Sequence, residues 1–166
     1  MEAKHVFIGL YPTLGQAPMS DRQIKEIDVL IRSRQTLLYI VSPEERRLTR
    51  ILAEVAQRQG KRFLVWTETA GLRPGNAQIP PEPDEATLDP LAALEAIRGR
   101  HEPAICLMKD FTIFLEPRFE KCNTVTRKLR DLAEALRTTY TTVVLISPRL
   151  YLPPELEKDV SVLDFE

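Results

Sequence analysis

Short apolar runs alternate with amphipathic stretches along most of the sequence, and this alternation limits the fold more than any other feature. The apolar runs are rich in residues that favour strands, whereas the stretches between them repeat apolar residues at helical spacing. Strands that alternate with helices form a mainly parallel sheet with helices on both faces. We therefore predict a three-layer α/β domain. The expected strands are residues 36–41, 62–67, 104–111, 141–147 and 160–165.

Start signals mark four expected helices. Ser20-Asp21-Arg22-Gln23 has the spacing of a capping box. Ser42-Pro43-Glu44-Glu45 combines a capping Ser, a Pro for the first helical position and a Glu three residues after the cap. Asp89-Pro90 predicts a third start, and Asn123 or Thr124 a fourth. We expect these helices to end near Arg34, at Gly60, near Gly99 and after Leu136.

Two segments fall outside this alternation. Residues 1–19 contain a possible short edge strand at His5–Gly9, but prolines and a glycine follow it, so we interpret the segment as an N-terminal appendage. Residues 69–87 carry four prolines and two glycines, which predicts a long loop excursion. Residues 20–166 are then one domain, as the length of the chain allows.

Composition excludes several classes of protein. Lys and Arg number 23 against 24 Asp and Glu, so the net charge of -1 creates no general attraction to nucleic acid or to an anionic membrane. No apolar stretch approaches the roughly 20 residues that span a bilayer. The first residues lack the apolar core of a secretory signal, so we expect a cytoplasmic protein.

Cysteine and histidine are too sparse for a metal site. Cys106 lies inside an apolar run and is interpreted as a buried hydrophobic residue, and Cys122 has no second cysteine at ligand spacing. His5 and His101 stand alone in the sequence. We expect neither a metal ion nor a cofactor.

Polar side chains follow three of the expected strands. Asp110 lies near the end of the third expected strand, residues 104–111. Ser42 follows the first strand, and Ser147 ends the fourth. The carboxyl ends of parallel strands meet at one edge of a sheet, where ligands of α/β proteins bind. Ser42, Asp110 and Ser147, with Glu44 and Glu45 of the turn after Ser42, therefore form a candidate crevice. The alternative is that an Asp and two Ser-Pro pairs at strand ends only stabilise turns.

The turn after the first strand lacks the residues of a phosphate loop. Such a loop needs glycines whose amides close on the phosphates, followed by Lys and Ser or Thr. Here Pro43 removes an amide donor, and Glu44 and Glu45 stand at the positive end of the helix dipole. We expect no ordinary triphosphate binding, no hydrolase triad and no enzyme activity, although weak nucleotide binding stays an alternative.

A receiver-like signalling domain is the alternative from another class. In it Asp110 would accept the phosphoryl group, Glu44 and Glu45 would bind Mg²⁺, and Ser147 would be the switch hydroxyl. A receiver also needs a Lys after its fifth strand, and residues 160–166 contain none.

An apolar group after the third strand is a candidate contact surface. Ile113, Phe114, Leu115 and Phe119 lie close together in a segment predicted as a loop at the ligand edge of the sheet. They favour binding of a protein partner or of a second copy of the chain. The alternative is that these side chains cover one end of the core.

From about Gln23 onward the sequence resembles the N-terminal, non-catalytic region of a group of AAA-type ATPases found in cyanobacteria, plastids and other bacteria. The order and spacing of the matching stretches carry the resemblance, which covers most of the chain. These stretches are Ile27–Arg34, Leu38–Arg46, Leu64–Thr67, Met108–Phe111, Val125–Leu132 and Pro153–Lys158.

The resemblance implies a RecA-like sheet of the P-loop type that has lost its phosphate loop. Counted along the chain, its five strands would lie in the order 5-1-4-3-2. It also implies that residues 20–166 are a degenerate RecA-like module which precedes an active ATPase module in such proteins. A partner would then be that AAA ATPase module or another copy of the chain.

Overall fold

A computed structural model describes residues 20–165. The expected appendage at residues 1–19, with its possible strand at His5–Gly9, lies outside the described residues. Within the described part, no helix is long and apolar enough to cross a membrane.

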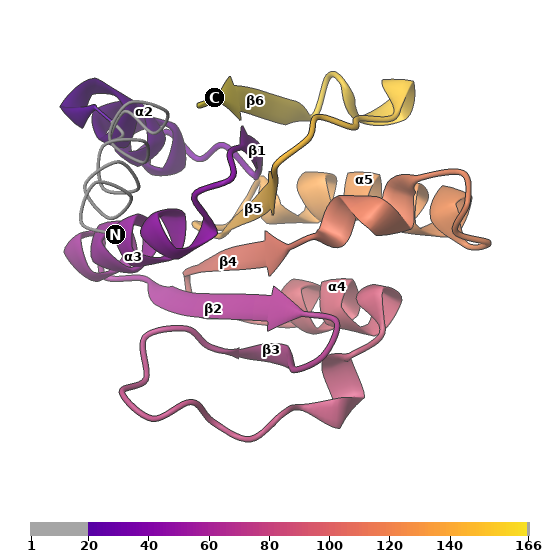
Figure 1. Ribbon diagram of the computed structural model, residues 1–166, viewed down its shortest axis with the longest axis horizontal. Helices are drawn as coiled ribbons and strands as arrows, with labels where there is room; N and C mark the ends of the chain where they lie inside the picture. Colours follow the sequence, from indigo (N-terminus) through magenta and orange to yellow (C-terminus); the bar gives the residue numbers. More distant parts are fainter. Residues whose placement is uncertain (1–19, 166) are drawn as a thin grey trace, which may run out of the picture.

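In the described part of the chain, six strands form one sheet, in the order β3-β2-β4-β5-β1-β6 (Figure 1). Neighbouring strands are parallel except β2 and β3, which are antiparallel. The five predicted strands keep the predicted relative order, but the predicted number is wrong because β3 adds a sixth strand at the edge. The strands are β1 (Leu37–Val41), β2 (Arg62–Thr67), β3 (Gly71–Pro74), β4 (Ala104–Lys109), β5 (Thr142–Ser147) and β6 (Val160–Asp164).

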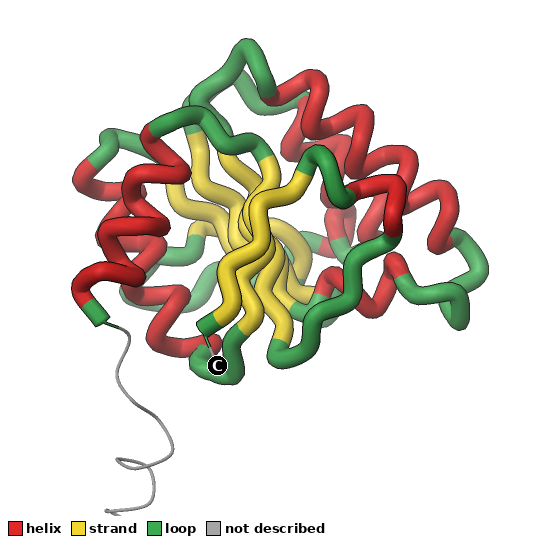
Figure 2. Tube along the Cα trace, turned by 90° about the horizontal axis from the view of Figure 1, so that it is seen from above, coloured by secondary structure: helices red, strands yellow, loops and turns green. Residues whose placement is uncertain are grey.

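Helices cover both faces of the sheet, which confirms the three-layer α/β prediction (Figures 1 and 2). One core layer joins α2 and α3 to the sheet, and the other joins α4 and α5. Three short 3-10 helices follow β3, β4 and β5. The helices are α2 (Asp21–Arg32), α3 (Glu45–Arg58), η1 (Glu85–Thr87), α4 (Pro90–Arg98), η2 (Phe111–Leu115), α5 (Cys122–Leu136) and η3 (Pro154–Leu156).

Two of the four predicted helix starts are confirmed. The Ser20 side chain closes a capping box with Gln23, and the Asp89 carboxylate accepts a hydrogen bond from the amide of Ala92 with Pro90 at the start of α4. Both motifs place an oxygen acceptor opposite the unpaired amides of the first turn.

The other two predicted starts are wrong. Helix α3 begins at Glu45, three residues after Ser42, because the Ser42 hydroxyl accepts from the amide of Glu44 and closes a turn instead. Helix α5 begins at Cys122 with Lys121 as its N-cap, so neither Asn123 nor Thr124 caps it. The backbone of residues 119–121 already supplies the turn there, through a bond from the Cys122 amide to the Phe119 carbonyl.

Strand β3 arises inside the excursion that was predicted as a loop. Gly71 has a φ of 72°, a left-handed conformation that reverses the chain after β2 and lets β3 pair with it. The Thr87 hydroxyl then accepts from the amide of Leu72, and the Trp66 indole donates to the Thr87 carbonyl at 2.7 Å. These bonds fasten both ends of the excursion to the sheet edge.

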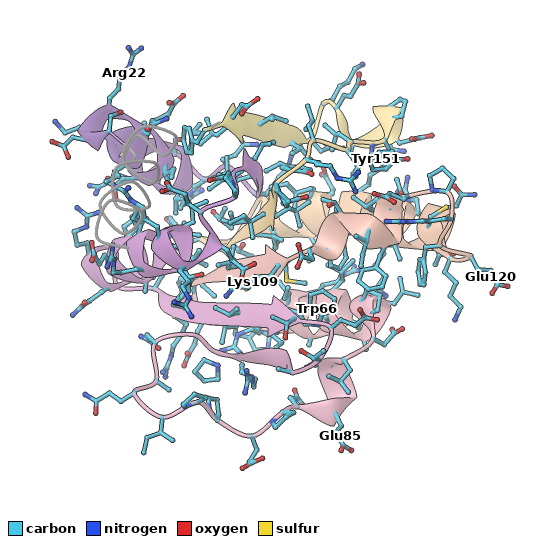
Figure 3. All side chains as sticks on the ribbon, viewed as in Figure 1. Arg22, Trp66, Glu85, Lys109, Glu120 and Tyr151 are labelled. Atoms are coloured by element: carbon cyan, nitrogen blue, oxygen red, sulfur yellow. The ribbon has the colours of Figure 1, made fainter. Side chains whose placement is uncertain are left out.

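Aromatic side chains fill the core between β2 and η2. Trp66, labelled in Figure 3, is fully buried and makes edge-to-face contacts with Phe111 and Phe114 at centroid distances of 5.4 and 5.9 Å. Phe114 continues the cluster to Phe119 at 5.1 Å. This geometry favours aromatic pairs beyond their burial, so the cluster fixes η2 against the sheet.

Candidate functional site

The structure brings together four of the five residues predicted for the crevice. They surround a hollow of about 300 Å³ at the carboxyl edge of the sheet, between the segments that follow β1, β4 and β5. Glu44 does not line it. The lining residues are Ser42, Pro43, Glu45, Asp110, Ile146, Ser147 and Pro148.

The two serines of the hollow bind backbone groups. Ser42 is buried, its amide donates to the Ser147 carbonyl at 3.0 Å, and its hydroxyl accepts from the amide of Glu44 at 3.1 Å. The Ser147 hydroxyl accepts from the amide of Arg149 at 3.3 Å. Both side chains thus stabilise the turns in which they lie, as the turn interpretation of the sequence predicts.

Asp110 occupies a strained turn at the end of β4. Its φ of 55° is left-handed, which Asp tolerates better than most residues, and its amide donates to the Ile146 carbonyl at 3.2 Å. The residue is exposed, and its carboxylate does not cap η2. Asp110 thus lines the hollow as an exposed residue that has no helix-capping role.

The two glutamates of the turn have different partners. Glu45 lies 3.1 Å from the amino group of Lys109, and Glu44 lies 3.7 Å from the guanidinium of Arg47. Sequence reasoning missed the pair of Glu45 with Lys109. A signal for it exists, since side chains alternate along a strand and Lys109 shares the face of Ile105 and Leu107, which pack against α3.

The segment between β1 and α3 differs in shape as well as in composition from a phosphate loop. It comprises only Ser42, Pro43 and Glu44, with no glycine, before α3 starts at Glu45. The carboxylates of Glu44 and Glu45 stand where the helix dipole would otherwise favour a phosphate. In residues 20–165, no group of three or more His, Cys, Asp and Glu side chains is placed to hold a metal ion.

The predicted contact residues fall into two groups. Phe114 and Leu115 are buried, and Phe119 packs partly buried against the same core, so these three cover the end of the core, the alternative raised from the sequence. Residues 111–115 of this segment form η2 instead of the predicted loop, and η2 turns the side chains of Phe114 and Leu115 inward. Ile113 stays 36% exposed on the outer side of η2.

A further exposed apolar residue lies at the same edge. Leu150 follows β5, the strand next to β4, and is 56% exposed. The Tyr39 hydroxyl donates to the Arg149 carbonyl at 2.7 Å and accepts from the Tyr151 amide at 3.2 Å. These two bonds hold the backbone on both sides of Leu150, so its side chain projects from a fixed segment.

Comparison with known proteins assigns most of the chain to one family. Residues 23–165 match the SpoVK-like AAA ATPase N-terminal domain. Three relatives carry the name uncharacterized AAA domain-containing protein ycf46. The protein from Guillardia theta is 30% identical over 86% of this chain, and those from Trieres chinensis and Pyropia yezoensis are 28% and 27% identical over 84%. The match spans only 27% of each relative's length.

Proposed function

The chain belongs to the family of SpoVK-like AAA ATPase N-terminal domains, and from this premise we propose that it is a non-catalytic module that acts through protein contacts. Its partner is an AAA ATPase module or a second copy of itself. One observation carries the non-catalytic part: the turn of residues 42–44 is too short and too acidic to close around phosphates.

The carboxyl edge of the sheet is the surface that best supports protein contact. Ile113 and Leu150 project from two segments that follow neighbouring strands, and each is attached to a rigid part of the fold. The hollow with Asp110 lies at the same edge. Apolar side chains beside a polar rim are typical of interfaces between proteins.

Calorimetric titration of the full chain with Mg-ATP and with Mg-ADP tests the non-catalytic part. We expect no saturable heat at micromolar nucleotide. Micromolar binding that Asp110→Ala removes, or ATP hydrolysis by the unmodified chain, would contradict the proposal and favour a nucleotide-binding domain.

A phosphoryl donor separates this proposal from a receiver-like domain. Incubation with acetyl phosphate and Mg²⁺ should leave the intact mass unchanged, since Glu45, one of the two carboxylates that would bind Mg²⁺ in a receiver, already pairs with Lys109. A phosphoryl adduct that disappears in Asp110→Asn would replace the proposal with the receiver function.

Paired charge substitutions test the contact surface. The variant with both Ile113→Asp and Leu150→Asp should lose self-association in sedimentation velocity, or binding to the purified AAA domain of the Guillardia theta relative. Ile79→Asp is the matched control, because Ile79 is 83% exposed but lies in the excursion after β3. The contact proposal fails if the unmodified chain shows neither association, or if the control weakens it equally.

A further inference from the structure

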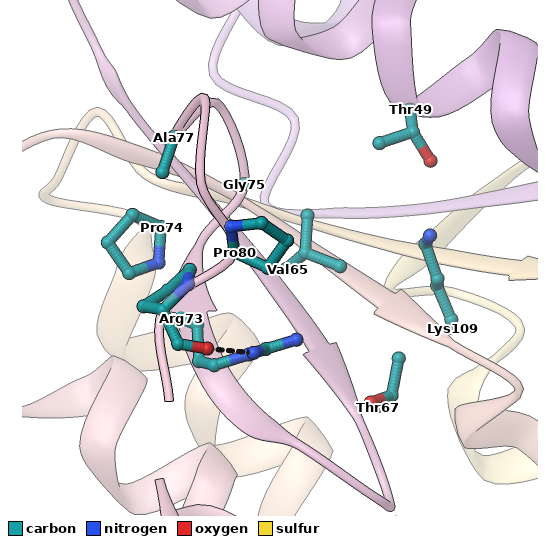
Figure 4. A pocket seen from close by; sticks show the side chains of 10 residues that line it. Thr49, Val65, Thr67, Arg73, Pro74, Gly75, Ala77, Pro80 and Lys109 are labelled. Carbon is teal, nitrogen blue, oxygen red and sulfur yellow. Dashed lines mark hydrogen bonds between the residues drawn. The ribbon is translucent and has the colours of Figure 1, made fainter. Parts of the chain in front are cut away.

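A second hollow lies between the start of α3, the ends of β2 and β4 and the excursion after β3 (Figure 4). We propose that it binds a single oxyanion, the phosphate of a small molecule or the carboxylate of an acidic side chain. Its volume is about 170 Å³. The lining residues are Thr49, Val65, Thr67, Arg73, Pro74, Gly75, Ala77, Pro80, Pro81 and Lys109.

Among the described residues that line this hollow, two carry a cationic side chain and none carries a carboxylate. Arg73 comes from β3 and Lys109 from the end of β4, so they approach from different sides, as Figure 4 shows. Arg73 donates one hydrogen bond to the Pro81 carbonyl and keeps further N–H donors. Charge-assisted bonds from such donors are the strongest that a protein offers to an oxyanion.

The remaining lining residues give the hollow its size and polarity. The Thr67 hydroxyl lies 3.4 Å from the Thr69 hydroxyl, a long contact that leaves it available to a ligand. The Thr49 hydroxyl donates to the Glu45 carbonyl, so its proton is not available to a ligand and the side chain only bounds the hollow. Liquid water takes about 30 Å³ per molecule, so the volume suits one phosphate or carboxylate with a few waters. Within residues 20–165, no aromatic side chain lines the hollow on which a nucleotide base could stack.

Glu45 connects this hollow with the one at Asp110. Its carboxylate lies 3.1 Å from the Lys109 amino group, and it also lines the crevice with Ser42 and Ser147. The side chain of Glu45 is 46% exposed and that of Lys109 18%. An oxyanion in the second hollow therefore competes with a carboxylate that is half in solvent, and removal of that competitor should strengthen binding.

This inference goes beyond the proposed contact function, because the second hollow shares no lining residue with the Asp110 crevice. Binding here needs no Mg²⁺ and should be unaffected by Asp110→Ala. Failure of one proposal is thus distinguishable from failure of the other.

Titrations of the full chain, followed by amide chemical shifts at constant ionic strength, test the site. One arm uses inorganic phosphate and the other an N-acetylated tetraglutamate peptide. Saturable shifts at Val65, Gly75 and Lys109 in either arm are the expected result. Phosphate alone identifies a small-molecule phosphate as the ligand, and tighter binding of the peptide identifies an acidic protein segment.

Variants separate this site from general surface attraction. Lys109→Gln should weaken binding roughly tenfold or more, the usual size of a charged hydrogen bond lost, and Glu45→Gln should strengthen it. Arg73→Gln should weaken binding by about the same factor as Lys109→Gln. The control is Arg62→Gln, at the opposite end of β2, where an exposed guanidinium pairs with Glu102.

The absence of saturable shifts in both arms would overturn the proposal. So would equal affinities for Lys109→Gln and the Arg62→Gln control. Because Lys109→Gln leaves the bond between Arg73 and Pro81 in place, its result does not depend on the shape of the excursion.

Discussion

The two faces of the sheet are closed in different ways. On the face of α4 and α5, the helices and η2 pack against the sheet and bury Trp66 and Phe111 between them. On the face of α2 and α3, the apolar core extends to Phe63 at β2, but Val65 is only partly buried and Lys109 reaches a hollow under a proline-rich loop. The first face is packed for stability, whereas the second leaves polar groups in reach of a ligand.

This difference depends on which strands are covered by a helix. Helix α3 packs against β2 and β4 (Figure 1). No helix covers β3 on that side, so residues 74–81, which include three prolines, close this edge of the sheet. A loop cannot fill the space above a strand as densely as a helix with an apolar face. We therefore expect chemistry and ligands at the second face and at the carboxyl edge.

Thiol labelling should show the largest difference between the two faces. Burial raises the pKa of the Cys106 thiol, on the α4 and α5 side, to about 12 from a usual value of 9.0. The thiolate population at a given pH therefore falls about a thousandfold. With Cys122 replaced by Ser, iodoacetamide at pH 8 should leave Cys106 unmodified in the intact mass.

A cysteine at Val65 provides the matched position on the other face. In a chain with Cys106→Val and Cys122→Ser, the substitution Val65→Cys should be labelled within the time that leaves Cys106 unmodified. Labelling of Cys106 at the same rate would mean that the α4 and α5 face opens readily, and the comparison between the faces would fail.

The aromatic cluster should carry the largest share of stability. Phe114→Ala should lower the free energy of unfolding by about 3 kcal/mol or more, the usual result of emptying a buried aromatic site. Its ring contacts Trp66, Phe111 and Phe119. Urea denaturation measures the change.

Ile113→Ala is the control within the same 3-10 helix. Its side chain is partly exposed, so we expect a loss of less than about 1 kcal/mol. A small loss for Phe114→Ala as well would remove η2 from the core and restore Phe114 as a contact residue.

The turn at Gly71 should show a smaller effect. A β-carbon there would collide with the Asp84 carbonyl and the Thr87 hydroxyl, in addition to the strain of φ 72°. We expect Gly71→Ala to cost about 2 kcal/mol in thermal or urea unfolding. Gly60→Ala is the control, with a φ of 66° but nothing within 4 Å of the new atom, and it should cost about 1 kcal/mol. Equal losses of unfolding free energy in the two variants would mean that Asp84 and Thr87 move aside without cost.

The cap of α4 should show the smallest change. Asp89→Ala removes the acceptor of the Ala92 amide and should cost about 1 kcal/mol. Asp89→Ser should keep most of that stability in the same denaturation assay, because Ser is also a good N-cap residue. A loss that Ser does not restore would show that Asp89 acts by another route than capping.

Five of the six strands are predictable from the sequence, whereas the starts of α3 and α5 are not. Apolar runs predict five of the strands. Strand β3 instead contains Gly71, Arg73 and Pro74, and it forms only because it pairs with β2. The predicted helix cap at Ser42 is wrong because a Ser hydroxyl can accept either from a helix amide or from an amide in a turn. The local sequence does not determine which amide donates to it.

The crevice at Asp110 was predictable and the second hollow was not. Ser42, Asp110 and Ser147 each end or follow a strand, so parallel topology alone brings them together. Arg73 and Lys109 are 36 positions apart in the chain. They meet at one hollow because β2 pairs with β3 on one side and with β4 on the other.

By itself the sequence determined the α/β class, the five parallel strands and the acidic turn without glycine, because these depend on periodicity and on residue type at neighbouring positions. Only the tertiary structure decided which apolar residues after β4 are buried and which two cations share a hollow. Phe114 and Ile113 are adjacent and both apolar, yet one is in the core and the other at the surface. That outcome depends on the rotation of η2 against Trp66, a contact between residues about fifty positions apart.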